Sequence, residues 1–418
     1  MSEINRAVKG TNDVLPEESY KWQYVERKML ETARLFGFKE IRVPVFEHTE
    51  VFKRSVGDTT DVVQKEMYTF DDKGGRSITL RPELTAGVIR SVIENGLYNQ
   101  SLPQKVCYIG GCYRYEKPQA GRLREFHQFG VECIGAAAPS ADAEVISLAH
   151  SVLTSIGLDR LSLEINSIGC PTCRAKYHKA LTEYFDSRKD ELCETCKDRL
   201  GRNPMRILDC KSPVCADVAK DAPVMIDYLC EDCDSHFEAV KAQLSEMGID
   251  YKVNPKIVRG LDYYTRTVFE FISGDIGAQS TVCGGGRYDG LMEQMGAPAT
   301  ASLGFAMGIE RLLLVLANQQ KEIGEKQYCD VYIAPMGEKA VVKASAICSQ
   351  LRKAGLSAQT DICGRGLKAQ MRYANKIGAK KSIVLGDSEL ESGIVRLKNM
   401  EDSTETEINL DQIVEALK

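Results

Sequence analysis

The stretch VCYIGGCYRYEKPQAGRLREFHQFGVECIG, residues 106–135, decides the fold. It predicts an antiparallel strand-loop-strand, with the loop at 116–125. Two sets of residues alternate along the second strand. One set is apolar and consists of Phe129, Val131 and Cys133, and the other consists of Gln128, Gly130 and Glu132. Because successive side chains of a strand point to opposite faces, the sheet has an apolar back and a polar strip. We interpret the strip as the floor of a substrate site in preference to a solvent-facing surface.

Segments on either side of this stretch predict further elements. Residues 17–36 predict a helix, and residues 38–48 predict a strand that is stopped at Pro44. Residues 77–95 predict a short strand, a turn and a helix. The glycine-rich stretch GGGRYDG, residues 284–290, lacks the Lys-Ser/Thr pair of a phosphate loop and the spacing of a dinucleotide site, so we expect a tight strand-to-helix turn there.

Composition excludes several classes of protein. With 418 residues, 43% hydrophobic and 27% charged, the chain has the composition of a globular protein of two or three domains, not of a disordered or collagen-like one. No apolar run approaches the roughly 20 residues that span a bilayer, and the opening residues lack the pattern of a signal peptide. We therefore expect a cytoplasmic protein with no membrane partner, whose 15 cysteines are reduced.

The end of the chain predicts a separate, small α/β domain. Its expected strands and helices alternate, which favours a sheet with parallel pairs. They are residues 329–335, 338–354, 366–377, 381–386 and 393–399. We place the boundary in the polar stretch 319–327, which gives domains 1–325 and 326–418.

Charge is divided sharply within this second domain, although the whole chain has a net charge of only −5. Residues 382–418 carry three basic and nine acidic residues. Residues 339–381 carry one acid, Asp361, against Lys339, Lys343, Arg352, Lys353, Arg365, Lys368, Arg372, Lys376, Lys380 and Lys381. This basic run is either a polyanion-binding face or a solvated helix surface.

Five arginines in structured contexts are candidates for a ligand site, since the five scattered histidines favour neither a His-based triad nor a His-rich metal site. These arginines are Arg114, Arg122, Arg124, Arg259 and Arg311. A single one would more often be a surface ion pair. Several together, with glycines close by, suit a polyphosphate held by guanidinium groups.

Several segments resemble the motifs of class II aminoacyl-tRNA synthetases. GFKEIRVPVFE (37–47) resembles their motif 1, YRYEKPQAGRLREFHQFGVECIG (113–135) resembles motif 2, and GFAMGIERLLL (304–314) resembles motif 3. RPELTA (81–86) and RGLDYYTRTVFEF (259–271) are similar to the histidine-binding signatures of the histidyl-tRNA synthetase family. The resemblance covers essentially the whole chain.

The resemblance implies an α+β catalytic domain with an antiparallel sheet flanked by helices, a homodimer joined around motif 1, and a C-terminal α/β anticodon-binding domain. It also implies a reaction in which L-histidine and ATP, with Mg²⁺, give histidyl-adenylate and pyrophosphate. The histidyl group then moves to the 3′ end of tRNA(His). Residues from about 159 to 254 depart from a plain synthetase core, and we expect mainly a helical insertion that faces the active site.

The resemblance also implies roles for individual residues. Arg114 and Arg259 would be catalytic, with Arg114 on the ATP α-phosphate and Arg259 on the α-phosphate and the histidine carboxylate. Further ATP contacts would come from Arg122 and Arg311, and histidine contacts from Glu83, Thr85, Gln128, Glu132, Tyr263 and Tyr264. Lys117 and Gln119 would touch the tRNA acceptor end.

A non-catalytic alternative comes from a related family. Relatives of this synthetase serve as regulatory subunits of ATP phosphoribosyltransferase. Such subunits typically lack the anticodon domain and lose the ATP-binding arginines and the RGLDYY signature. The sequence retains all of these features, which favours the enzyme.

Eight of the 15 cysteines lie within the expected insertion. They are Cys170, Cys173, Cys193, Cys196, Cys210, Cys215, Cys230 and Cys233. Six of them form three CxxC pairs, whose spacing is typical of structural zinc sites. The alternative is that small apolar cysteines fill a core and that the spacing is coincidental.

Overall fold

The 106–135 stretch forms two paired strands of the largest sheet that the structure describes. Strand β5 (Gln104–Tyr113) pairs antiparallel with β6 (Glu125–Ile134), with Gly110 opposite Gln128. The computed structural model describes residues 5–57, 60–208, 210, 212–257, 259–325 and 329–417. These residues form two compact units, Met1–Gly324 and Glu325–Lys418. Residue 326, at which we start the second domain, lies outside the described residues.

The first unit is built on an eight-stranded sheet in the order β1-β5-β6-β11-β10-β9-β7-β8. Its other strands are β1 (Lys39–Glu40), β7 (Leu161–Ser167), β8 (Lys252–Val253), β9 (Thr265–Ser273), β10 (Thr281–Arg287) and β11 (Ser302–Gly308). The central pairs are antiparallel, as predicted, but β1 runs parallel to β5 and β8 runs parallel to β7. The sheet is therefore mixed and not purely antiparallel. The parallel β8 is possible because the long helical insertion returns the chain to the starting end of β7.

Helices cover the apolar back of this sheet. They are α1 (Pro16–Leu35), α4 (Pro139–Ser155), α8 (Glu231–Glu246) and α10 (Ile309–Asn318). Their buried side chains form one core with Phe129, Val131 and Cys133, which confirms the predicted apolar face of β6. A second core lies on the opposite face, where α3 (Thr85–Glu94) and α9 (Leu291–Gln294) pack against a group of tyrosines.

One of the expected strands differs from its prediction. The 38–48 segment forms only the two-residue β1 and then, after Pro44, the strand β2 (Phe46–His48) of a separate sheet with β4 (Ser77–Leu80) and β3 (Tyr68–Asp71). The side chain of Arg81 satisfies the irregular backbone in between, since its Nη1 donates to the carbonyl of Val43 at 2.7 Å.

The expected strand-to-helix turn at 284–290 is present but shorter than predicted, because the glycines 284–286 and Arg287 belong to β10 and only residues 288–290 lead into α9. Neighbouring groups lie too close for side chains at these glycines. A Cβ on Gly284 would lie 2.5 Å from Nη2 of Arg259.

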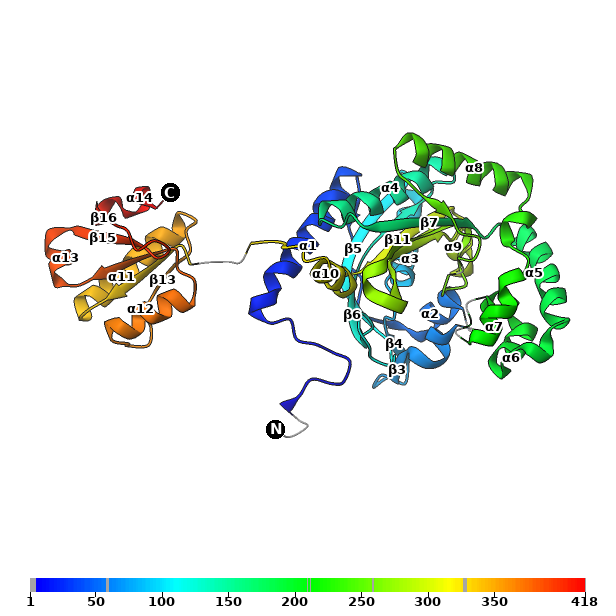
Figure 1. The fold of residues 1–418 in the computed structure, drawn as a ribbon, viewed down its shortest axis with the longest axis horizontal. Coiled ribbons are helices and arrows are strands. Elements are labelled where there is room, and N and C mark those ends of the chain that lie inside the picture. The colour runs from blue at the N-terminus through cyan, green and yellow to red at the C-terminus, as the bar shows by residue number, and fades with distance from the viewer. Residues whose placement is uncertain are drawn as a thin grey trace. The chain divides into compact units, whose positions relative to one another are not determined.

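The expected insertion is helical, but its ends belong to the sheet as β7 and β8. Between them lie α5 (Pro171–Asp186), α6 (Glu194–Arg202), α7 (Pro213–Val218) and α8, and short 3₁₀ turns connect them. Figure 1 shows α5, α6 and α7 grouped together at one side of this unit. These three helices share a small core of their own, which contains four buried cysteines.

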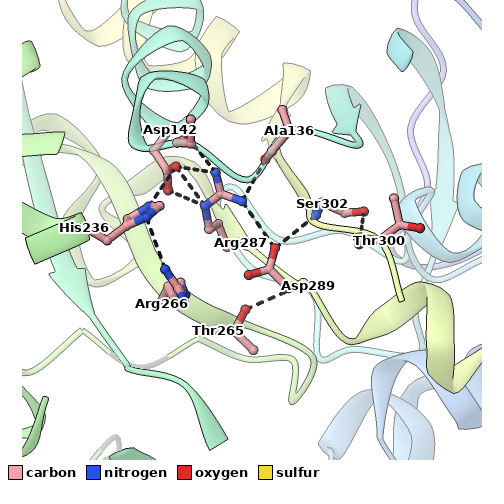
Figure 2. A network of polar contacts seen from close by, with 10 residues as sticks. Ala136, Asp142, His236, Thr265, Arg266, Arg287, Asp289, Thr300 and Ser302 are labelled. Carbon is pink, nitrogen blue, oxygen red and sulfur yellow. Dashed lines mark hydrogen bonds and ion pairs between the residues drawn. The ribbon is translucent and has the colours of Figure 1, made fainter. Parts of the chain in front are cut away.

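A buried network of charged side chains ties β9, β10, α4 and α8 together (Figure 2). Arg287 is 0% exposed, and its Nε donates to the Asp142 carboxylate at 2.8 Å. The same carboxylate lies 3.1 Å from Nε2 of His236, whose Nδ1 lies 3.3 Å from Arg266. Arg287 also pairs with Asp289, so the network fixes the chain on both sides of Tyr288.

The second unit is an α/β sheet in the order β13-β12-β14-β15-β16. Its elements are β12 (Val331–Pro335), α11 (Glu338–Lys353), β13 (Ala358–Thr360), α12 (Leu367–Lys376), β14 (Lys381–Leu385), α13 (Asp387–Ser392), β15 (Ile394–Asn399), β16 (Glu405–Asn409) and α14 (Ile413–Ala416). Strand β12 pairs parallel with both β13 and β14, so the predicted parallel pairs are confirmed.

The basic residues of this unit lie on two sides of its sheet. Helix α11 packs with Val331 and Ile333, whereas Ala374 of α12 packs with Tyr332 and Ala334. Because alternate residues of β12 point to opposite faces, the two helices cover opposite faces. The basic residues of α11 and those of α12 therefore lie on helices that cover opposite faces of the sheet. In neither unit does a described helix have the length and apolar character needed to cross a membrane.

Candidate active site

A cavity of about 320 Å³ opens on the polar face of β6. Four neighbouring strands, β6, β9, β10 and β11, line it, together with the loop between β5 and β6 and the 259–264 segment. Among its lining residues are ten that the sequence predicted, namely Glu83, Thr85, Arg114, Arg122, Gln128, Glu132, Arg259, Tyr263, Tyr264 and Arg311. Segments far apart in sequence thus bring their candidate side chains to one cavity.

Other protein groups hold three of the cavity's arginines in place. Two of them donate to backbone carbonyls, and the third pairs with a buried carboxylate. Arg311 donates from Nη1 to the carbonyl of Thr281 at 2.6 Å, and Arg114 donates from Nε to Pro82 at 2.8 Å. Arg122 pairs with Glu116 at 2.7 Å. Burial lowers the pKa of Arg311, and the nearby charge of Arg122 lowers it further. Such a concentration of positive charge favours an anion in the cavity.

Arg259 lies deeper, at the centre of the cavity wall. It pairs with Glu270 of β9, and its guanidinium lies over the ring of Tyr264, 5.5 Å from the centroid. Its Nε is buried and has no hydrogen-bond partner among the described residues. Burying an unpaired donor is costly, so this N–H favours a ligand that accepts a hydrogen bond.

Glu132 lies at the polar floor and is 1% exposed. The hydroxyl of Tyr108 donates to its carboxylate at 2.8 Å, and the hydroxyl of Tyr288 donates to the other oxygen. Burial raises the pKa of Glu132 to about 8. The close approach of Gly304 leaves room for this carboxylate, since a Cβ there would overlap it. A carboxylate can accept further hydrogen bonds beyond these two, so it can recognise a ligand N–H.

The remaining polar groups lie at the start of α3 and along β6. Glu83 is buried and accepts from the backbone N–H of Thr85 at 2.6 Å and of Ala86 at 2.9 Å. Burial raises the pKa of Glu83. Gln128 accepts from the thiol of Cys112 at 3.3 Å, which leaves its amide NH₂ without a protein partner among the hydrogen bonds of the described residues.

Comparison with known proteins identifies the family. The family model described as Histidyl-tRNA synthetase matches residues 10–195 and 210–312, and the model described as Anticodon binding domain matches residues 330–418. The chain belongs to the histidyl-tRNA synthetase family. Members of this family are aminoacyl-tRNA synthetases, ligases that act in translation.

Similar proteins span the full length of the chain. The histidine–tRNA ligase of Acetivibrio thermocellus is 56% identical over 99% of this chain and 100% of its own length. That of Caldanaerobacter subterraneus subsp. tengcongensis is 55% identical with the same coverage. The crystal structure of apo histidyl-tRNA synthetase from S. aureus is 41% identical and superposes with a TM-score of 0.85 over 99% of both chains.

Three predicted residues are not among those that line the histidyl-tRNA synthetase cavity. Lys117 and Gln119 are exposed on the loop between β5 and β6 and are not among its lining residues. Gln119 exchanges two backbone hydrogen bonds with Arg122, at 3.0 and 2.9 Å. This small bridge turns the loop back so that Arg122 reaches the cavity. Arg124, the remaining candidate, stacks over Tyr115 at 4.0 Å and is likewise not a lining residue.

Sequence reasoning missed several residues of the site. Glu116, Glu270 and Tyr288 line the cavity, and Tyr108 supports its floor through Glu132. Strand alternation could have found Tyr108, because it lies opposite Gly130 on the polar face. Tyr288 lies within the glycine-rich stretch 284–290, but no local signal indicated its contact with Glu132.

The eight insertion cysteines fall into two groups. Cys170, Cys173, Cys230 and Cys233 form one group, and Cys193, Cys196, Cys210 and Cys215 form the other. Within each group, all sulfur atoms lie within 4.8 Å of one another.

Proposed function

We propose that the cavity activates L-histidine with ATP to form histidyl-adenylate and pyrophosphate, and that the chain then transfers the histidyl group to the 3′ end of tRNA(His). One observation carries this proposal. A single cavity holds four arginines beside a buried carboxylate, and a full-length match to histidine–tRNA ligases accompanies it. The arginines suit ATP, and the carboxylate suits a small ligand with an N–H group.

Adenylate formation needs little covalent help from the protein. The histidine carboxylate attacks the α-phosphate, pyrophosphate leaves, and the reaction requires two anions to be held together while charge develops. Arg114 contacts the α-phosphate, and Arg122 and Arg311 contact the outer phosphates. Arg259, through its unpartnered Nε–H, contacts the α-phosphate and the histidine carboxylate. Mg²⁺ enters with ATP, and Glu116 and Glu270 place carboxylate oxygens, its preferred ligands, among the arginines.

Histidine is recognised at the polar floor. Neutral imidazole has one N–H donor and one acceptor nitrogen, so its recognition needs an acceptor and a donor. Glu132 accepts from the N–H, and the hydroxyl of Tyr264 donates to the other nitrogen, with Tyr263 packed 4.7 Å from Tyr264. Glu83, Thr85 and Gln128 hold the α-amino group.

tRNA(His) binds through both units. Lys117 and Gln119 contact the acceptor end, which agrees with their exposure on the loop beside the cavity. Residues 330–418, which match the anticodon-binding model, contact the anticodon region. Phosphate contacts supply much of the affinity for RNA, and the exposed basic residues of α11 or α12 can provide them. Since these helices cover opposite faces of the sheet, one RNA segment contacts the basic residues of only one of them.

The chain works as a homodimer in the cytoplasm. Motif 1 leads into an exposed apolar surface, where Phe46 is 57% and Phe70 is 48% exposed. The two side chains lie at one shallow hollow of the three-stranded sheet. An exposed aromatic pair in a hollow is typical of a protein interface and supports assembly around motif 1.

Histidine-dependent exchange of labelled pyrophosphate into ATP tests the proposed activity. We expect rapid exchange by the full chain, and a loss of at least about 10²-fold in Arg259→Ala, because this substitution removes a donor that acts on developing charge. Arg396→Ala, an exposed arginine of the second unit, should behave like the parent. Absence of exchange in the folded parent would contradict the proposal and favour a non-catalytic regulatory subunit.

A further inference from the structure

We propose that the insertion holds two zinc ions, each bound by four cysteine thiolates. The first site consists of Cys170, Cys173, Cys230 and Cys233. The second consists of Cys193, Cys196, Cys210 and Cys215. Each Zn²⁺ displaces four thiol protons as it binds and leaves a site with a net charge of −2. The role of both ions is structural, because four protein ligands leave no open position for a substrate.

The distances between the sulfur atoms match this coordination. A tetrahedral ion with Zn–S bonds of about 2.3 Å requires sulfur atoms about 3.8 Å apart. In the first site, Sγ of Cys170 lies 3.6 Å from Cys173 and 4.0 Å from Cys230. In the second site, Sγ of Cys193 lies 3.9 Å from Cys210. The eight side chains, spread over residues 170–233, thus form two sets whose sulfur atoms lie close enough to share one ion in each set.

The backbone around the sulfurs suits thiolates. Cys170, Cys193 and Cys230 directly precede α5, α6 and α8, and each partner cysteine lies in the first turn of that helix. Free N–H groups and the helix dipole at these ends stabilise negative charge. In addition, the N–H of Cys230 donates to Sγ of Cys173 at 3.0 Å, and the N–H of Cys193 donates to Sγ of Cys215 at 3.2 Å. These contacts link the two pairs within each site.

Disulfides, an iron–sulfur cluster and plain core packing all fit the geometry of the cysteines less well. A disulfide needs sulfur atoms about 2.05 Å apart, well below the 3.6 to 4.0 Å measured between these thiols. An iron–sulfur cluster distributes its four thiolates over two or four separate irons, so some of its cysteine sulfurs lie farther apart than the 4.8 Å within which all four lie here. Simple core filling does not explain why one cysteine of each pair is buried and the other only half-buried in both sites.

The insertion also has a physical need for such ions. Its own core of α5, α6, α7 and the connecting turns is small, and four of its buried residues are cysteines. Small cores are often completed by a structural metal. The first site joins the start of α5 to the start of α8. The second site lies between them in sequence, so the loop that it closes lies within the loop closed by the first site.

The second site has a consequence for the active site, in a step that rests on the proposed function. Arg206 lies between Cys196 and Cys210, in the turn Pro204–Ile207. Its Nη2 donates to the carbonyl of Gly260 at 3.0 Å and to Asp262 at 3.0 Å. The 259–264 segment carries Arg259, Tyr263 and Tyr264 of the cavity. By fixing the turn that bears Arg206, the second zinc ion makes Arg206 a positioning residue for that segment.

Metal analysis of the full chain, purified under reducing conditions without added metal, tests the zinc proposal. We expect two zinc ions per chain. The double variant Cys170→Ser/Cys173→Ser and the double variant Cys193→Ser/Cys196→Ser should each retain one, and the matched control Cys363→Ser, an exposed cysteine elsewhere, should retain two. Cobalt(II) should replace zinc with the visible spectrum of a tetrahedral thiolate complex. Less than one zinc per chain, iron in its place, or eight freely titratable thiols in the parent would overturn the proposal.

A separate measurement tests the role of Arg206 and does not depend on a variant that lacks metal. Arg206→Ala should retain two zinc ions and raise the KM for histidine in pyrophosphate exchange by about 10-fold with a smaller change in kcat. Arg206→Lys should recover part of the loss. An unchanged KM in Arg206→Ala, in an enzyme that exchanges pyrophosphate, would show that the anchor does not position the segment. Absence of exchange in the parent would instead contradict the proposed function.

Discussion

At the residue scale, we propose that Glu132 carries the choice of amino acid. Its carboxylate is buried between the hydroxyls of Tyr108 and Tyr288, and it faces the cavity. An amino acid without a matching N–H leaves this group unpaired. The site therefore rejects such an amino acid by a factor of roughly 10⁴ to 10⁵ relative to histidine. Selection of this strength requires no editing domain.

Glu132→Ala should lower histidine-dependent pyrophosphate exchange by at least about 10²-fold. At about 1.4 kcal/mol per decade, this loss is within the cost of leaving a buried imidazole N–H without its acceptor. The control is Glu144→Ala, which removes a carboxylate paired with Lys105 outside the cavity. If folded Glu132→Ala keeps the parent's kcat and histidine KM, the imidazole is recognised by other residues.

The raised pKa of Glu132 predicts a dependence of stability on pH. Its folded pKa is about 8, against an ordinary value of 4.5, so the folded protein holds a proton that the unfolded chain releases between these values. Unfolding then releases a proton, and stability falls as the pH rises through this window. Glu132→Gln removes this titration. In urea denaturation, the variant should gain stability relative to the parent from pH 5 to pH 9, and parallel pH profiles would contradict the assignment.

At the element scale, the buried network of Figure 2 holds α4 and α8 against β9 and β10. Asp142→Asn should destabilise the first unit by about 3 to 5 kcal/mol, because it removes the closer of the two carboxylates that pair with the charge of fully buried Arg287. Asp159→Asn, in an exposed pair with Lys321, should have little effect on the same denaturation curve. Equal stability of the two variants would show that the network is not a major contributor.

The same scale shows how far the sequence predicts the structure. Alternation along β6 predicted its two faces correctly, because the pattern of side chains follows directly from the geometry of a strand. The glycines of β10 were assigned to the turn that follows the strand, because the groups that crowd them are distant in sequence. Arg259 lies against Gly284, Phe305 against Gly285 and Val268 against Gly286. The grouping of the insertion cysteines was also hidden, since eight thiols allow many pairings and only the fold selects two sets of four.

At the scale of the whole molecule, the two units divide the work. Every residue that we assign to ATP and histidine lies before Glu325, whereas the anticodon-binding match begins at residue 330. The first unit has its own cores and its own cavity. Activation of histidine should therefore not need the second unit, although charging of tRNA should.

Histidine-dependent pyrophosphate exchange by a shortened chain that ends at Glu325 tests this central claim most directly. We expect the shortened chain to exchange pyrophosphate at a rate within about 10-fold of the full chain, and only when histidine is present. Its charging of tRNA(His) should fall by at least about 10²-fold, because many phosphate contacts are lost. A folded shortened chain that fails to exchange pyrophosphate, or that exchanges it equally well without histidine, would contradict the account.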